Sequence, residues 1–427
     1  MGILKDLNEL QSEGIVSDET ANRIRYFYDG KKSSASGRLF LVFGILGAIL
    51  VGSGIILILA HNWDDLSRLV KTAFAFLPLL VGQVLCGFSI LRRSDSQAWR
   101  ESSSAFLFFA VGSSISLVSQ IYNIPGDLGS FLLTWSVLCL PLVYLMRSSV
   151  TSLLYIITIT YYLTETGYWS SNDSGTYIYW ILLVAVLPYY YGLLKARPNS
   201  NFIAFHNWVL PGSVIISLGS IAQREEELMF VSYMSLFGLL YAIGRKKEFG
   251  EGNLWTNGFR VLGSFGIVTL LMIVSFKWFW EEVYSKKYDM TLFISPEFLS
   301  VLVLGILMLA VTTSNYRGKS LNQLSPMDWV GPAFMALYFL GYASPVSLIL
   351  VNLLIFILGI LMIREGARAD HLGILNYGLL IITILIVCRF FDSNLSFALR
   401  GVTFVLVGAG FFGTNYWILK KRKNEPK

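Results

Sequence analysis

The sequence predicts an all-α integral membrane protein, a polytopic bundle of about fourteen transmembrane helices. Apolar residues make up 55% of the 427-residue chain and charged residues only 14%, whereas a soluble domain carries about 25% charge. The apolar residues also occur in separate blocks, most of them close to the roughly 20 residues that a helix needs to cross the hydrocarbon core. Short basic clusters separate these blocks, as in polytopic membrane proteins.

The first 37 residues are mostly polar and are predicted to form a cytoplasmic helical hairpin. Leu7 and Leu10 fall on one helical face, Gly14 suits a C-terminal cap, and Ser17 suits the N-cap of a second helix. The hairpin either docks a partner or second subunit, or packs against the cytoplasmic face of its own bundle. We favour the second interpretation, because a single apolar stripe is what a helix needs to cover a neighbouring surface.

Residues 38–419 are predicted to form the transmembrane bundle, and residues 420–427 a basic cytoplasmic tail. A span is expected wherever an apolar block lies between charged or turn-rich breaks. The expected spans are 38–60, 69–91, 102–121, 128–146, 149–164, 176–195, 204–222, 228–244, 261–280, 297–314, 328–342, 345–363, 371–390 and 396–419.

The distribution of basic residues predicts the orientation of this bundle. With the N-terminus inside, eight of the 33 Lys and Arg residues fall in outer segments, and all the others fall in inner segments or the two ends. The positive-inside rule therefore places both termini in the cytoplasm of a multi-pass protein. The eight outer residues are Arg68, Lys71, Arg224, Lys277, Lys286, Lys287, Arg389 and Arg400.

Several classes of function find no support in the sequence. The net charge is +6, but the basic residues form no single patch, so nucleic-acid binding is not expected. Cys86, Cys139 and Cys388 are isolated within apolar blocks, which indicates neither disulfides nor a thiolate metal site. There is no phosphate-binding glycine loop and no His-Glu-x-x-His motif. The sequence therefore assigns no catalytic residue, cofactor or metal ligand.

Polar residues near the middle of the predicted spans are neutral. No span has Asp or Glu near its centre, which argues against a carboxylate proton relay but leaves uniport and lipid handling open. Gln83, Asn352 and Asn376 lie nearer the middle of their spans. They either line a solute path or tie helices together by hydrogen bonds, and we favour the second interpretation. Glu365 is expected at a solvated helix end.

Polar residues concentrate in three predicted outer elbows, and these are the candidate ligand-binding residues. If the elbows converge, Arg389 pairs with Asp64 or Asp392 beside a polar pocket. Alternatively, the same residues form an interfacial belt, in which aromatic side chains anchor the helices at headgroup depth. Asp127 also suits the N-cap of the helix that follows it. The candidates are His61, Asn62, Asp64, Asp65, Gln120, Tyr122, Asp127, Arg389 and Asp392.

The sequence around these elbows resembles that of a family of bacterial membrane proteins, the family called domain of unknown function 2157. The resemblance rests on short motifs in a fixed order: Ala60-His61-Asn62-Trp63, Gln120-Ile121-Tyr122, Gly126-Asp127, Arg364-Glu365-Gly366, Asn376-Tyr377-Gly378, Arg389-Phe390-Phe391-Asp392 and Arg400-Gly401. It is best up to about residue 150 and next best over about the last 65 residues. It implies location in the bacterial cytoplasmic membrane and brings no activity or catalytic residues.

Three functions fit these observations. A transporter or permease for a small or lipid-like solute fits the span count and the short loops. A scaffold or sensor would bind a partner through the N-terminal hairpin. An envelope enzyme acting on a lipid-linked substrate is disfavoured because the outer loops leave little material for a site. The expected partners are the lipid bilayer, an unknown solute or lipid, and a second copy of the chain, because Gly44, Ala48 and Gly52 form a small-residue stripe.

Overall fold

A computed structural model describes residues 7, 10–11, 13, 16–24, 63–168, 174–223, 225–249, 254–285, 290–317, 325–392, 401–402, 405, 408–410 and 412–413. Among these residues there are helices and connecting turns but no strand, so the predicted all-α class is confirmed. The chain divides into two compact units, Met1–Phe76 and Leu77–Lys427. The predicted first span, 38–60, lies outside the described residues, and so does most of the last, 396–419.

In the unit Met1–Phe76, two serines begin helices. The Ser17 hydroxyl accepts a hydrogen bond from the Thr20 backbone N–H at 3.4 Å, as expected of an N-cap, and residues 18–24 are helical. The Ser67 hydroxyl accepts one from the Val70 N–H at 3.4 Å, where α3 (Arg68–Arg92) begins. The N-terminal hairpin as a whole stays a prediction, because many of its residues lie outside the described ones.

The described helices follow the predicted spans closely. Each expected span from 69–91 to 371–390 overlaps one α-helix, except 261–280, which is divided between two, and 128–146 agrees at both ends. After α3 these helices are α4 (Gln97–Tyr122), α5 (Leu128–Met146), α6 (Ser149–Leu163), α7 (Ser174–Ala196), α8 (Asn201–Leu218), α9 (Glu226–Gly244), α10 (Gly258–Val274), α11 (Lys277–Ser285), α12 (Pro296–Asn315), α13 (Pro326–Gly341), α14 (Ser347–Arg368) and α15 (Leu372–Asp392).

Nine of these described helices are long and apolar enough to cross a membrane, or ten if the bent pair α10–α11 forms one span. These helices do not establish the expected total of about fourteen spans. Helices α6 (15 residues) and α13 (16 residues) are shorter than the nine candidate spans, and the first and last expected spans are largely undescribed. Large apolar side chains such as Leu91 (82% exposed) and Val84 (71% exposed) face outward from these helices. The chain is therefore a membrane protein with multiple candidate spans.

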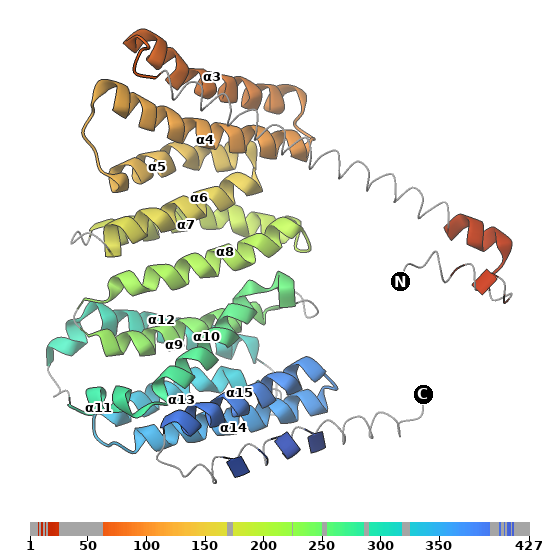
Figure 1. Ribbon diagram of the computed structural model, residues 1–427, viewed down its shortest axis with the longest axis vertical. Coiled ribbons are helices and arrows are strands. Elements are labelled where there is room, and N and C mark those ends of the chain that lie inside the picture. The colour runs from red at the N-terminus through yellow and green to blue at the C-terminus, as the bar shows by residue number, and fades with distance from the viewer. Residues whose placement is uncertain are drawn as a thin grey trace. The chain divides into compact units, whose positions relative to one another are not determined.

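Within residues 77–427 the helices lie in layers that follow the chain order (Figure 1). Helices α4 and α5 are followed by α6 to α8, then by α9, α10 and α12, and finally by α13 to α15. Helix α9 packs against α10, α12 and α13, so it lies at the centre of the second half of the stack. The interiors are apolar, with one core cluster around α4 to α8 and another around α9 to α15.

Side-chain caps define the elbows between helices. The Asp127 carboxylate accepts hydrogen bonds from the Ser130 backbone N–H and hydroxyl, both at 2.8 Å, which confirms its expected role as the N-cap of α5. Ser148 caps α6 and Ser295 caps α12 in the same manner. In lipid the first N–H groups of a helix find no water, so each cap marks where the chain re-enters the membrane.

The predicted span 261–280 is divided into α10 and α11, which meet at an angle of 74°. The division follows from composition, because Lys277, Glu281 and Glu282 cannot enter lipid at low cost. Helix α11 instead turns its polar face outward and buries Phe279 and Trp280 against the second core cluster. The Trp280 indole N–H donates to the Val274 carbonyl at 2.7 Å, which satisfies one of the last carbonyls of α10.

Candidate functional site

The structure places the predicted outer residues in separate surroundings. Asp64 and Asp65 are exposed in the elbow before α3, where the Lys71 ammonium lies 5.7 Å from the centre of the Trp63 ring. Such an aromatic and cationic pair is typical of an interfacial anchor. His61 and Asn62 lie outside the described residues, as does the side chain of Asp392, so no pairing with Asp392 is described.

The elbow between α4 and α5 holds three further predicted residues. Gln120 and Tyr122 are exposed at the end of α4, and Asn123 ends that helix in the left-handed region with φ 51°. Asp127 is exposed but serves as the N-cap of α5. The hydrogen bonds from Ser130 hold the pKa of Asp127 below its usual range, so this carboxylate stays ionised at neutral pH.

Arg389 lies against the break between α10 and α11. Its guanidinium donates a hydrogen bond to the Ser275 hydroxyl at 3.2 Å and lies 4.8 Å from the centre of the Phe276 ring. The Asn352 amide donates to the Ser275 backbone carbonyl at 3.1 Å and to the Leu348 carbonyl at 2.8 Å. Arg389 and Asn352 thus contact the same interrupted turn, where a broken helix leaves backbone groups without helical partners.

Some of the polar residues within the helices form ties between them. Asn352 connects α14 to the α10–α11 break, as the favoured interpretation of the sequence expects. The Thr160 hydroxyl of α6 lies 2.6 Å from the Ser213 hydroxyl of α8, which also lies 2.7 Å from the Tyr179 hydroxyl of α7. Gln83 and Asn376 are exposed on the helix surfaces.

A cavity of about 360 Å³ opens between α7, α8, α9 and α12. Its deeper wall is apolar and includes Leu236 of α9 and Leu304 of α12. On α12 the wall continues to Leu299, which is 61% exposed, and to Val303. Because these helices are candidate spans, we expect this exposed wall to face lipid.

Polar side chains line the other end of the same cavity. They are Thr176 in the first turn of α7, Ser220 and Gln223 just after α8, and Ser300 near the start of α12. All four lie at helix ends that the charge distribution predicts to be outer. The cavity is therefore amphipathic, with polar groups at one end and hydrocarbon side chains at the other. This arrangement suits a ligand with a polar head and an apolar body.

A buried carboxylate stabilises the polar end of this cavity. Glu297, in the first turn of α12, is fully buried and accepts hydrogen bonds from the Gln223 N–H at 2.6 Å and the Glu225 N–H at 3.2 Å. It therefore caps, from a neighbouring helix, the turn that leads into α9. The Ser232 hydroxyl of α9 and the Ser300 hydroxyl of α12 lie 2.6 Å apart and form a second link. Helices α9 and α12 are thus joined where the cavity is polar.

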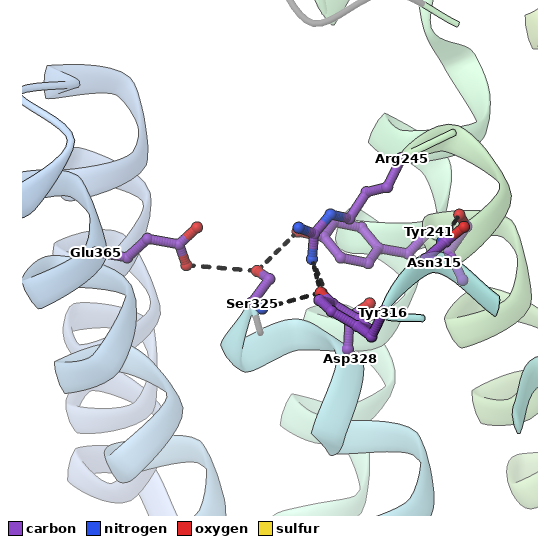
Figure 2. Close-up of polar contacts among 8 residues, drawn as sticks. Tyr241, Arg245, Asn315, Tyr316, Ser325, Asp328 and Glu365 are labelled. Carbon is purple, nitrogen blue, oxygen red and sulfur yellow. Dashed lines mark hydrogen bonds and ion pairs between the residues drawn. The ribbon is translucent and has the colours of Figure 1, made fainter. Parts of the chain in front are cut away.

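At the opposite ends of α9 and α12 a polar cluster joins four helices (Figure 2). The Arg245 guanidinium, just after α9, donates to the Asp328 carboxylate of α13 and to the Tyr316 hydroxyl at the end of α12. Tyr316 also donates to Asp328 and accepts from the Ser325 N–H at 3.1 Å. The Asp328 side chain is 3% exposed and that of Arg245 is 23% exposed. This is a largely buried ion pair, fully supported by hydrogen bonds.

Ser325 extends the cluster toward α14. Its hydroxyl lies 3.1 Å from the Tyr241 hydroxyl and donates to the Glu365 carboxylate at 3.4 Å (Figure 2). Glu365 is half-buried rather than fully solvated, because α14 packs against α13 at this end. Burial raises the pKa of Tyr316 to about 12, so its hydroxyl keeps its proton and remains a donor. Burial by itself would lower the pKa of Arg245, but the attraction of Asp328 raises it overall.

The cavity and the cluster share helices α9 and α12 but lie toward opposite ends. On α12 the cavity wall ends at Leu307 and the cluster begins at Asn315 and Tyr316. Eight to nine residues of helix separate them, which corresponds to roughly 13 Å along the axis. Among the sequence candidates whose side chains the structure describes, none lines the cavity or belongs to the cluster. The residues of both sites come from distant segments with no shared motif.

Comparisons with known proteins identify one family. Residues 8–152 match the model of a family described as predicted membrane protein (DUF2157), which confirms the resemblance over that stretch. The C-terminal motifs of the resemblance lie beyond the matched residues. No curated protein and no solved structure matches the chain.

Proposed function

Because residues 8–152 match a membrane-protein family and the described helices enclose an amphipathic cavity, we propose that the protein is a transporter or permease for a lipid-like solute. The cavity between α7, α8, α9 and α12 carries this proposal. Its polar end would hold a headgroup beside Ser220 and Ser300, and its apolar end would hold a hydrocarbon chain beside Leu304. The opening toward the bilayer would let such a solute enter from the lipid.

In this proposal the cluster around Arg245 closes the route at the predicted cytoplasmic end. Movement of a solute across a membrane requires that access alternate between the two sides. An ion pair that joins α9 to α13 opposes separation of these helices, and both partners are buried enough to make its rupture costly. The molecule would thus be open toward the outer leaflet and closed toward the inner one.

The outer elbows are proposed as separate points of contact with the solute at the predicted outer face. Asp64, Asp65, Gln120, Tyr122 and Asp127 are exposed at their elbows, and Arg389 lies at the α10–α11 break. His61, Asn62 and Asp392 belong to the same proposal on sequence grounds. Asp127 and Arg389 also have local structural contacts, because Asp127 caps α5 and Arg389 donates to Ser275.

We further propose that the protein spans the bacterial cytoplasmic membrane with both termini in the cytoplasm. The expected outcome is that alkaline phosphatase fused after Lys427 remains inactive, whereas a fusion within residues 167–176 is active. The reason is that the basic clusters are retained on the cytoplasmic side. Measurement of phosphatase activity in cells checks both fusions, and an active C-terminal fusion or an inactive internal fusion would reject this orientation.

The cavity is tested by filling it. We expect Val303→Trp to slow lipid movement at least about threefold, because the larger indole would take up part of a cavity of about 360 Å³ and narrow it. Leu302→Trp is the matched control, since Leu302 is 45% exposed and Val303 is 46% exposed on the same helix, but Leu302 does not line the cavity. The full chain is reconstituted in phosphatidylethanolamine vesicles with nitrobenzoxadiazole-labelled phosphatidylglycerol, and dithionite bleaching reports the movement of the label between leaflets.

The result that supports the proposal is faster bleaching of the inner leaflet with wild type and Leu302→Trp than with Val303→Trp. Equal rates with and without protein, or equal rates for the two tryptophan variants, would overturn it. Asp64→Ala and Arg389→Ala are measured in the same assay to test the two outer elbows separately. A wild-type rate for either variant would mean that its elbow does not contribute to lipid movement, and it would leave the proposal for the cavity unchanged.

A further inference from the structure

A second cavity, of about 520 Å³, lies at the ends of α4, α5 and α7, toward the opposite end of α7 from the first cavity. Three arginines line it: Arg100 in the first turn of α4, Arg147 just after α5, and Arg197 just after α7. The rest of its wall includes the hydroxyls of Ser149 and Tyr189, which lie 3.0 Å apart. The charge distribution predicts that this end of the bundle is cytoplasmic.

Among the described residues, the three arginines form no ion pair with a carboxylate. Within that same part of the chain, the buried Nε of Arg100 has no hydrogen-bond partner. Arg197 donates to the neutral side chain of Gln97 at 3.2 Å, and Arg147 is exposed. The cavity therefore holds guanidinium groups whose preferred partner, a planar or tetrahedral oxyanion, is not supplied by the described chain.

The one carboxylate that lines this cavity has another role. Glu101 accepts hydrogen bonds from the Ser148 hydroxyl at 2.5 Å, the Val150 N–H at 2.9 Å and the Ser149 N–H at 3.1 Å. Its negative charge therefore satisfies the first N–H groups of α6, which otherwise have no partner. The cavity is lined by three arginines and by this one carboxylate, which already binds α6, so positive charge is in excess.

We propose that this cavity binds the phosphate group of an anionic ligand, either a lipid headgroup or a soluble phosphate. Arginine forks match phosphate oxygens in pairs, and the hydroxyls of Ser149 and Tyr189 offer additional donors. The wall beside Pro188 and Leu193 is apolar, so a group attached to the phosphate can lie against it. This cavity is a separate site from the one between α7, α8, α9 and α12, and its phosphate binding does not require lipid transport there.

The test removes charge from the two exposed arginines. Arg147→Asn should leave the backbone conformation unchanged, because Arg147 has φ 48° and asparagine tolerates this left-handed region. Combined with Arg197→Gln, this change should weaken phosphate-group binding at least about tenfold, since each basic residue beside an anionic surface contributes roughly 1 kcal/mol. Lys195→Gln is the matched control, an exposed basic residue of the same helix end that does not line the cavity.

Two probes distinguish the sources of the phosphate. Native mass spectrometry of the detergent-solubilised full chain measures retained phosphatidylglycerol, and calorimetry measures binding of inorganic phosphate. Loss of phosphatidylglycerol alone in the double variant would assign a lipid headgroup, and loss of inorganic phosphate binding would assign a soluble ligand. The proposal is overturned if the wild type binds neither probe, or if Lys195→Gln weakens binding as much as the double variant. Arg147→Lys with Arg197→Lys keeps the charge but not the paired donors of the fork, so it should bind more strongly than the neutral double variant and more weakly than the wild type.

Discussion

Asp328→Ala is expected to lower the free energy of unfolding by about 3–5 kcal/mol, the largest effect of any single change considered. Asp328 has a side chain that is 3% exposed, and it accepts hydrogen bonds from both Arg245 and Tyr316. Its removal leaves the Arg245 guanidinium largely buried without its counter-ion, and it leaves the Tyr316 hydroxyl without its acceptor. The unfolding of the purified chain in mixed micelles, followed by circular dichroism during titration with dodecyl sulfate, measures the change.

Two comparison variants show whether burial of the pair is the cause. Asp95→Ala removes an exposed aspartate at the same predicted end of the bundle and should change stability by less than about 0.5 kcal/mol. Arg245→Leu combined with Asp328→Leu removes both charges and should be more stable than Asp328→Ala, because no charge remains buried alone. If Asp328→Ala unfolds like the wild type, the cluster does not join the four helix ends as described.

Gly263→Ala is expected to destabilise the protein by about 2 kcal/mol, because α9 and α10 approach each other closely at this glycine. A Cβ atom on Gly263 would lie 2.5 Å from the Tyr241 backbone nitrogen and 2.7 Å from the Phe237 carbonyl oxygen. Backbone atoms cannot turn aside as a flexible side chain can, so the two helices would have to separate. The same titration with dodecyl sulfate measures the effect.

Gly212→Ala provides the matched control for this change. Gly212 also lies within a helix, α8, but a Cβ atom there would meet nothing within 4 Å. We expect it to be neutral or to stabilise the protein by up to about 1 kcal/mol, because alanine favours the helix more than glycine does. If the two variants are equally stable, the close contact between α9 and α10 contributes nothing to stability.

The amino-acid sequence by itself determined the all-helical membrane class, the positions of the helices and several of their ends. Expected and observed spans agree closely from α3 to α15, and Ser17 and Asp127 cap helices as expected. The reason is that these features are local. A helix in lipid must form hydrogen bonds between its own backbone groups and carry a continuous apolar surface. Its length and its ends are therefore determined by consecutive residues.

Only the tertiary structure decided which distant residues meet. Arg245 and Asp328 are 83 positions apart, Glu297 caps a turn 74 positions before it, and Glu101 caps a helix that begins nearly 50 positions after it. Both cavities likewise combine residues from helices far apart in the chain. In lipid the neighbours of a helix are chosen by side-chain packing and a few polar contacts, and no local pattern encodes that choice. The bend between α10 and α11 was also decided by the tertiary structure, because Asn352 of α14 and Arg389 of α15 contact its interrupted turn.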